Sequence, residues 1–200
     1  MGYSIKNLSD LDEGSSRCMS RIFIESFGHM FEKFSKDKEA LIECFEKSFI
    51  YDMIYVALDG GRVVGFIAVS SCKGRAINVN KKEFCNHFGK IKGAIFSWQL
   101  KMIMGKAAVS EPNQCYIDFV AVDKDYRRKG VAIELFNYIH EHLIFDEFIL
   151  DVLTTNPEAQ KLYEKLGYKV DKVKKSIMTR AEGLGDLVIM KHKIILWKIY

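Results

Sequence analysis

The segment 114–143 constrains the fold more than any other part of the chain. Its first run, QCYIDFVAV, is mostly apolar and predicts a buried strand over Gln114–Val122. Between this strand and a predicted helix, Arg127, Arg128 and Lys129 stand directly before Gly130. The helix is predicted from apolar residues that recur at helical spacing, namely Ala132, Leu135, Phe136, Ile139 and Leu143. The segment therefore joins a strand to a helix through a cationic loop.

A loop of this kind can hold an anion. The first turn of a helix offers unpaired backbone N–H groups and about half a positive charge. The three cations add charge, and Gly130 and Ala132 leave room for oxygen atoms to approach the backbone. Because neither GxxxxGK(S/T) nor GxGxxG is present, the pattern predicts some other phosphorylated ligand. The alternative is a solvated turn.

Two motifs resemble those of the GNAT superfamily of N-acetyltransferases. Arg127–Ala132 resembles its Q/R-x-x-G-x-G/A segment, and NPEAQKLYEKLGYK, residues 156–169, is similar to a later helix of the family. The specific part covers residues 116–169, with Lys124 where the family often has proline. The resemblance implies an α/β (α+β) fold, with a mixed, mostly antiparallel sheet of about six to seven strands flanked by helices. We expect a single domain over residues 1–200, with a helical insertion at about 79–109 between the third and fourth strands.

The rest of the chain predicts the remaining elements. Asp59-Gly60-Gly61 between two β-rich runs predicts a hairpin. Asn156-Pro157 predicts the start of a helix that ends before Gly167. The other expectations are a strand over Tyr3–Leu8, a helix capped by Asp12 or Ser15, a helix over Lys36–Phe49, and two final strands in YKVDKVKK and LVIMKHKIILW, joined through Gly183-Leu184-Gly185.

The expected insertion has its own apolar pattern. Large apolar residues alternate at spacings of four and three and predict one helix face, made by Phe84, Phe88, Ile91, Ile95, Trp98 and Met102. Gly89 and Gly93 weaken or bend this helix. We expect the face to be buried on the acceptor side of the cleft, against the sheet or against a second subunit. Lysines on the remaining surface leave peripheral membrane or acidic-partner binding as an alternative; they are Lys82, Lys90, Lys92 and Lys101.

The resemblance implies acetyl-coenzyme A (acetyl-CoA) as cosubstrate, bound between two diverging strands. Asn156 would contact the pantetheine arm; the alternative is a helix cap alone. Tyr163 would point at the sulfur and give the departing thiolate a proton or a hydrogen bond; the alternative is a core tyrosine. The backbone of Val120, Ala121 and Val122 would contact pantetheine, and the pyrophosphate would lie on Arg127, Arg128, Lys129, Gly130, Val131 and Ala132.

The base that deprotonates the amine has several candidates. Strand alternation places Tyr116, Asp118 and Val120 on one face, where the family often has its base or a residue that holds water. Asp118 is the only carboxylate there and is our prediction. One alternative is that Asp118 is purely structural. The base would then be a water held by Tyr116, or another carboxylate, Glu25 or Glu111.

These features predict an acetyl-CoA-dependent N-acetyltransferase that acts on a primary amine of a small molecule or of a protein or peptide. The alternative is a non-catalytic CoA-binding sensor or scaffold. A net charge of +4 permits an anionic ligand, but no nucleic-acid motif accompanies it. Five scattered cysteines without a CxxC pair and an N-terminus without an apolar signal predict a cytoplasmic protein without a metal site or stable membrane insertion. A homodimer is compatible with the sequence.

Overall fold

The computed structural model describes residues 2–175, 179–180 and 183–194. Its helices and strands follow the order β1 (Ser4–Asn7), α1 (Glu13–Phe27), α2 (Lys38–Glu46), β2 (Ile54–Asp59), β3 (Arg62–Ser70), α3 (Lys81–Phe88), α4 (Lys90–Met104), β4 (Gln114–Val122), α5 (Val131–His142), β5 (Glu147–Leu153), α6 (Pro157–Lys165), β6 (Lys169–Lys174) and β7 (Leu187–Lys193). Across the described ranges, no helix has both the length and the apolar content needed to cross a bilayer. Residues 195–197, the end of the last predicted strand, lie outside them.

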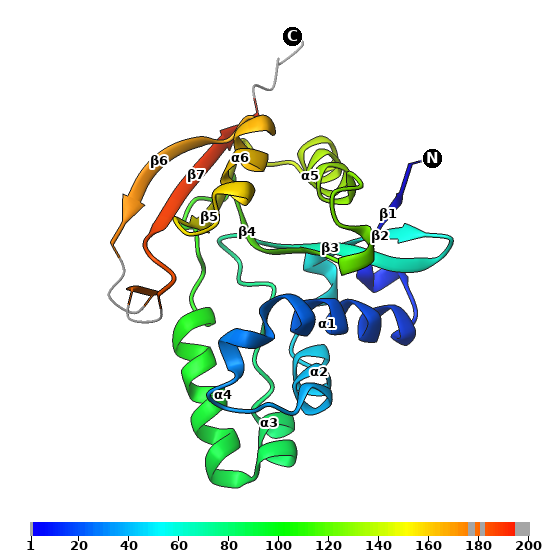
Figure 1. Ribbon diagram of the computed structural model, residues 1–200, viewed down its shortest axis with the longest axis vertical. Helices are drawn as coiled ribbons and strands as arrows, with labels where there is room; N and C mark the ends of the chain where they lie inside the picture. The colour runs from blue at the N-terminus through cyan, green and yellow to red at the C-terminus, as the bar shows by residue number, and fades with distance from the viewer. Residues whose placement is uncertain (1, 176–178, 181–182, 195–200) are drawn as a thin grey trace.

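The strands form one seven-stranded sheet in the order β1-β2-β3-β4-β5-β7-β6. Neighbours β4 and β5 run parallel, and the other neighbouring pairs are antiparallel. The fold class implied by the resemblance is therefore confirmed (Figure 1). The predicted hairpin is also confirmed, because Gly60 and Gly61 turn the chain from β2 into β3 with φ angles of 55° and 86°.

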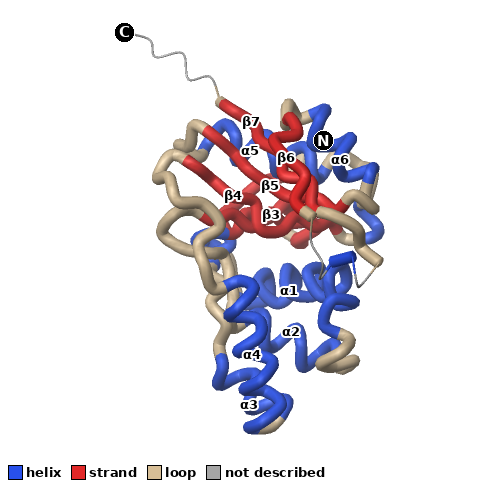
Figure 2. Tube along the Cα trace, turned by 90° about the vertical axis from the view of Figure 1, so that its left-hand side faces the viewer, coloured by secondary structure: helices blue, strands red, loops and turns tan. Residues whose placement is uncertain are grey.

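Helix α1 packs on one face of this sheet, with α2 to α4 beyond it, and α5 and α6 lie on the other side (Figures 1 and 2). Of the two predicted caps of α1, the structure has Asp12, whose side chain accepts a hydrogen bond of 2.9 Å from the Ser15 backbone N–H.

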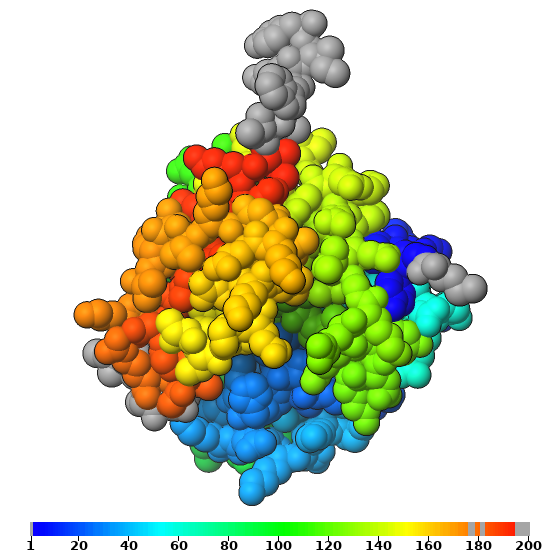
Figure 3. All heavy atoms as spheres, turned by 45° about the horizontal axis from the view of Figure 1, so that its top comes forward, coloured from blue at the N-terminus to red at the C-terminus, as the bar shows by residue number. Residues whose placement is uncertain are grey.

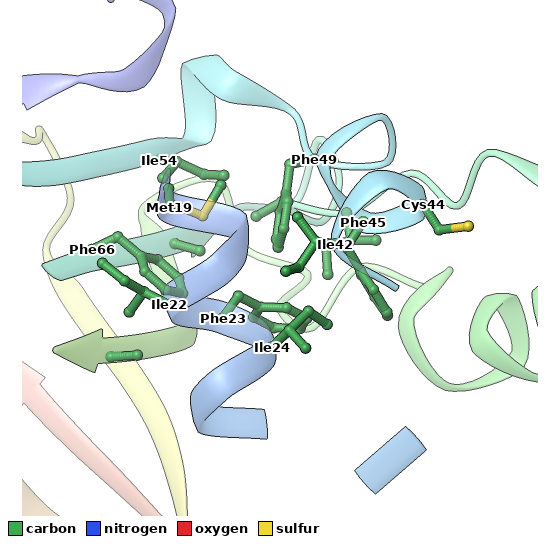
Figure 4. Packing of buried hydrophobic residues seen from close by; sticks show 14 of the residues in the cluster. Met19, Ile22, Phe23, Ile24, Ile42, Cys44, Phe45, Phe49, Ile54 and Phe66 are labelled. Carbon is green, nitrogen blue, oxygen red and sulfur yellow. The ribbon is translucent and has the colours of Figure 1, made fainter. Parts of the chain in front are cut away.

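The core under α1 is rich in phenylalanine. Figure 4 shows Phe23 of α1 among Phe45, Phe49 and Phe66, and its ring centroid lies 4.9 Å from that of Phe45. This core fixes α1 against β3 and β4 of the sheet.

The insertion between β3 and β4 consists of two helices, α3 and α4, that pack against each other. Gly89 separates them with a φ of 82°, a backbone angle that favours glycine. Because α4 restarts in a new direction after this turn, the helical periodicity of α3 does not continue into it. Phe84 of α3 is buried as predicted. On α4 the predicted burial within the chain is wrong, because Phe96, Leu100 and Met104 are buried, whereas Ile91, Ile95, Trp98 and Met102 are exposed. Burial of these four residues against a second subunit stays a prediction.

Gly93 lies where α3 and α4 touch, and a Cβ at this position would collide with the backbone oxygen of Phe84. We expect Gly93→Ala to lower the free energy of unfolding by about 1–3 kcal/mol through overpacking. The direction is informative, because alanine favours an unconstrained helix by about 1 kcal/mol over glycine. Urea unfolding beside Lys92→Ala, an exposed position on the same helix, measures the difference. A Gly93→Ala protein as stable as the wild type would contradict this close contact.

Candidate active site

Strands β4 and β5 lie side by side at one end and separate at the other. They pair over Gln114–Tyr116 and Glu147–Ile149, and past these residues no described strand pairs with this edge of β4. Residues 120–122 pair with β3 on one side and therefore have an open backbone edge on the other. The strands diverge in Figure 1, and Figure 3 shows a hollow between the green surface of the β4–α5 segment and the yellow surface around α6. This opening is the candidate cleft.

A β-bulge decides where the side chains of β4 point. The register with β3 shifts opposite Asp118, which leaves this residue as the extra one on β4. Tyr116 and Asp118 both contact Arg75, whereas Val120 packs against the core under α5 and α6. The expectation that Tyr116, Asp118 and Val120 share a face is therefore wrong for Val120, because the bulge resets the alternation.

The cationic loop after β4 is anchored at its start. Asp123 is buried; its Oδ1 accepts a hydrogen bond of 3.0 Å from the Asp125 backbone N–H, and its Oδ2 pairs with Arg62 at 2.8 Å. The Tyr126 hydroxyl donates to the Asp59 carboxylate at 2.9 Å. These contacts hold the start of the loop against the β2–β3 hairpin.

Arg127, Arg128 and Lys129 follow this anchor and are exposed. In the described part of the chain none of the three forms an ion pair, and the Arg127 guanidinium donates only to the Val122 carbonyl, at 3.4 Å. Lys129 lies over the Tyr126 ring, with its Nζ 5.0 Å from the centroid. The positive charge of this segment is therefore available to an anion.

The loop leads directly into the start of α5. Arg128 and Gly130 have φ angles of 62° and 85°, and such left-handed residues direct successive backbone N–H groups toward one side. No side chain caps the helix, so the N–H groups of Val131 and Ala132 lack a capping acceptor. A Cβ on Gly130 would meet no atom within 4 Å, which leaves the approach to these groups open.

Asn156 and Tyr163 belong to the α6 side of the cleft. The Asn156 Oδ1 accepts a hydrogen bond of 3.2 Å from a backbone N–H of the first helical turn, so its capping role is confirmed. Tyr163 is only 8% exposed, and its ring packs 5.5 Å from that of Phe136. Burial, with a smaller contribution from Asp151, raises the pKa of Tyr163 to about 12. Its hydroxyl is therefore protonated at neutral pH and forms no hydrogen bond with another described residue.

Asp118 is held from three directions. Its Oδ1 pairs with the Arg75 guanidinium at 2.6 Å, and its Oδ2 accepts hydrogen bonds from the Ser70 hydroxyl and, at 3.0 Å, from the Ala76 backbone N–H. Burial raises the pKa of Asp118, although Arg75 and the hydrogen bonds oppose this rise. These contacts tie the loop after β3 to β4 and give Asp118 a structural role; whether it also accepts a proton stays a prediction.

A second carboxylate near the cleft, the half-buried Asp151, was not anticipated from the sequence. It lies on β5 two residues past Ile149, where pairing with β4 ends. Burial raises the pKa of Asp151, with Arg75 and Lys174 opposing the rise, and the carboxylate forms no hydrogen bond or ion pair with another described residue. A charged residue inside the apolar run EFILDVL was the available signal. Arg75, in a loop without a motif, gave none.

Two further base candidates, Glu25 and Glu111, are surface residues. Glu25 of α1 is exposed and lines a cavity of about 320 Å³ together with Cys18, Arg62 and Asp123. This cavity lies between α1 and the start of the cationic loop. Glu111 is exposed and precedes β4, at the end where β4 and β5 are still paired.

Comparison with known proteins agrees with this arrangement. The model of the Acetyltransferase (GNAT) family matches residues 18–168. N-alpha-acetyltransferase 30 of Xenopus laevis is 42% identical over 60 residues, which are 28% of this chain and 22% of that protein. The match therefore spans less than a quarter of the curated relative's length.

Solved structures share the fold. An N-acetyltransferase from Staphylococcus aureus Mu50 superposes with a TM-score of 0.63 at 17% identity, over 94% of this chain and 99% of that chain. A chain of the NatC complex bound to Gag peptide and CoA superposes with a TM-score of 0.56 at 15% identity, over 97% and 99% of the two chains. At these identities the likeness concerns the fold alone.

Proposed function

This chain belongs to the acetyltransferase (GNAT) family, and we propose that it transfers the acetyl group of acetyl-CoA to a primary amine. Between a small-molecule amine and a peptide, we propose the α-amino group of a peptide. The observation that carries the proposal is the separation of β4 from β5, with a cationic helix start on one side and Tyr163 on the other. The likeness to an N-alpha-acetyltransferase supports the choice of acceptor.

The parts of the cofactor suit the groups around the cleft. The amides of pantetheine can pair with the open backbone edge of residues 120–122, much as an added strand would. The pyrophosphate suits the uncapped N–H groups of Val131 and Ala132 and the unpaired charges of the loop before them. Asn156 supplies a side-chain amide on the α6 side. These assignments divide the cofactor between the two strands that separate.

The chemistry of the amine favours an α-amino acceptor. An alkylamine with a pKa of about 10.4 costs roughly 4–5 kcal/mol to deprotonate at pH 7, whereas an α-amine with a pKa of about 7.8 costs roughly 1 kcal/mol. Of the two carboxylates near the cleft, that of Asp118 is buried and already paired, and Asp151 is half-buried. A site with few free carboxylates suits the α-amine, because this amine costs less free energy to deprotonate.

The proposed reaction forms a carbon–nitrogen bond and breaks a carbon–sulfur bond, with a net transfer of one proton from nitrogen to sulfur. The amine nitrogen attacks the acetyl carbon, its proton passes to a carboxylate directly or through water, and the carbon–sulfur bond breaks. A backbone N–H on the open edge of β4 stabilises the negative charge on the carbonyl oxygen. Tyr163, protonated because its pKa is about 12, donates a proton to the departing thiolate, which leaves as CoA thiol. The proton held by the carboxylate then returns to Tyr163 through solvent.

The proton acceptor is tested by two matched variants. Between the two carboxylates, geometry favours Asp151, since Asp118 already has three partners. We expect Asp151→Asn to lower kcat/KM by about tenfold at pH 7, the cost of relying on spontaneous loss of the α-amine proton. The deficit should shrink as pH rises toward the pKa of the acceptor. The measurement is kcat/KM against pH for Asp151→Asn and Asp118→Asn. If Asp118→Asn alone loses the acid limb of the profile, Asp118 is the base.

The activity itself is tested by CoA thiol release with three acceptors: a peptide with a free N-terminus and no lysine, an N-terminally acetylated peptide with one lysine, and a polyamine. We expect release with the first. Release with the polyamine alone would contradict the peptide acceptor and leave N-acetyl transfer standing. Acetyl-CoA binding without thiol release from any of them would favour the non-catalytic sensor or scaffold. Absence of binding would contradict both.

A further inference from the structure

The outer face of α4 is an exposed apolar stripe. Its four members follow one another at spacings of four, three and four residues, which places them on one side of the helix. They are Ile91, Ile95, Trp98 and Met102, which are 79%, 52%, 62% and 63% exposed. The opposite side of α4 packs into the core through Phe96, Leu100 and Met104. We call the four exposed residues the α4 stripe.

Lysines border the α4 stripe on both sides. At about 100° per residue, Lys90 and Lys101 fall on one flank and Lys92 on the other, and all three are exposed. Among the described residues none of them forms an ion pair. Residues 72–110 contain eight Lys or Arg and one Glu, a net charge of +7 in a chain whose total is +4. The segment that contains the stripe is therefore strongly basic, although Arg75 within it is paired with Asp118.

We propose that the α4 stripe docks the protein onto an anionic lipid surface. Aliphatic side chains and a tryptophan between lysines are the composition of helices that lie in the membrane interface, because the apolar side chains enter the acyl boundary while the lysines stay at the headgroups. Tryptophan prefers this depth. Anionic headgroups complement the local charge of +7. This surface is separate from the cleft between β4 and β5, and the proposal does not depend on the proposed reaction.

Other occupants fit less well. A second copy of the chain would bring its own +7 segment against this one, and like charges oppose such a contact. A nucleic-acid duplex is held through its phosphates and offers no apolar surface for the stripe. Single strands stack their bases on aromatic rings, whereas three of the four stripe residues are aliphatic or thioether side chains. A helix that docks on another protein usually enters a groove on that partner. In Figures 1 and 2, α4 lies along an outer side of the helical part of the molecule, and this convex edge suits a flat surface.

The direct test follows Trp98 itself. The chain has two tryptophans, so Trp197→Phe leaves Trp98 as the only one. This protein is mixed with vesicles of phosphatidylcholine alone or of phosphatidylcholine with phosphatidylserine, and both sedimentation and Trp98 emission are measured. We expect binding and a shift of emission to shorter wavelength with the anionic vesicles, both decreasing as salt rises. Absence of binding at low salt, equal binding to both vesicles, or binding without an emission shift would overturn the proposal.

Matched variants locate the contact on α4. Trp98→Gln should weaken binding to anionic vesicles by about tenfold or more, and Lys92→Gln and Lys101→Gln by roughly fivefold each. The controls are Ile144→Gln, at an exposed apolar position outside α4, and Lys169→Gln on β6. Equal losses in the controls would overturn the assignment. A dimer that Trp98→Gln dissociates, without vesicle binding, would assign the stripe to a second copy. Binding to an acidic peptide but to neither vesicle would assign it to a protein partner.

Discussion

Gly130→Asp is expected to weaken acetyl-CoA binding by about a hundredfold or more. The new carboxylate would stand at the uncapped start of α5, where the pyrophosphate is proposed to bind. Gly130→Asn is the matched control, because asparagine has the same shape without the charge, and both residues tolerate a left-handed backbone. A Cβ at Gly130 meets no atom within 4 Å, and both variants share the strain of the positive φ, so the comparison isolates the charge. We expect a loss of about tenfold or less for Gly130→Asn.

Calorimetric titration of the two folded variants with acetyl-CoA measures this difference. A large loss in Gly130→Asp with a small one in Gly130→Asn means that negative charge at this position, and not backbone strain, opposes the ligand. Equal losses would attribute the effect to the backbone angle of 85°. If both variants bound as tightly as the wild type, the cationic loop would not hold the cofactor.

The cationic loop was predictable because its determinants are local. A strand, a glycine and a helix that follow one another in sequence must also follow one another in space, so Gly130 could be placed at the start of α5 from the pattern alone. The cap at Asn156 was predictable for the same reason: its side chain bonds a backbone group three residues along the chain. The resemblance supplied the order of the strands, which no local pattern contains.

The parts that were missed depend on contacts between distant segments. The bulge at Asp118 depends on pairing with β3, and a single extra residue was enough to move Val120 to the opposite face. Arg75 meets Asp118 across 43 positions of the sequence, through a loop whose path no motif predicts. On α4, period alone could not tell the buried face from the α4 stripe, because the helix is apolar on two sides. Which side faces inward was decided by the turn at Gly89 and the close contact at Gly93.

Removal of the Tyr163 hydroxyl is expected to lower kcat by about 100- to 10,000-fold, the usual range for a general acid. In Tyr163→Phe the ring remains to pack against Phe136, so the affinity for acetyl-CoA should change little. Tyr168→Phe is the matched control. Tyr168 belongs to the same core cluster, and its hydroxyl lies 2.9 Å from Nε2 of His140. Removing that hydroxyl should cost about 1 kcal/mol of stability with little effect on kcat.

The two variants separate chemistry from packing, because each removes one buried tyrosine hydroxyl from the same cluster. Single-turnover rates of acetyl transfer, cofactor affinity and urea unfolding are measured for both. If Tyr163 is the acid, its variant loses rate and keeps affinity, and it keeps most of its stability because the lost hydroxyl has no hydrogen-bond partner among the described residues. A turnover within about twofold of the wild type would be far below the general-acid range. In that case Tyr163 would be a packing residue like Tyr168, and the thiolate would take its proton from solvent entering between β4 and β5.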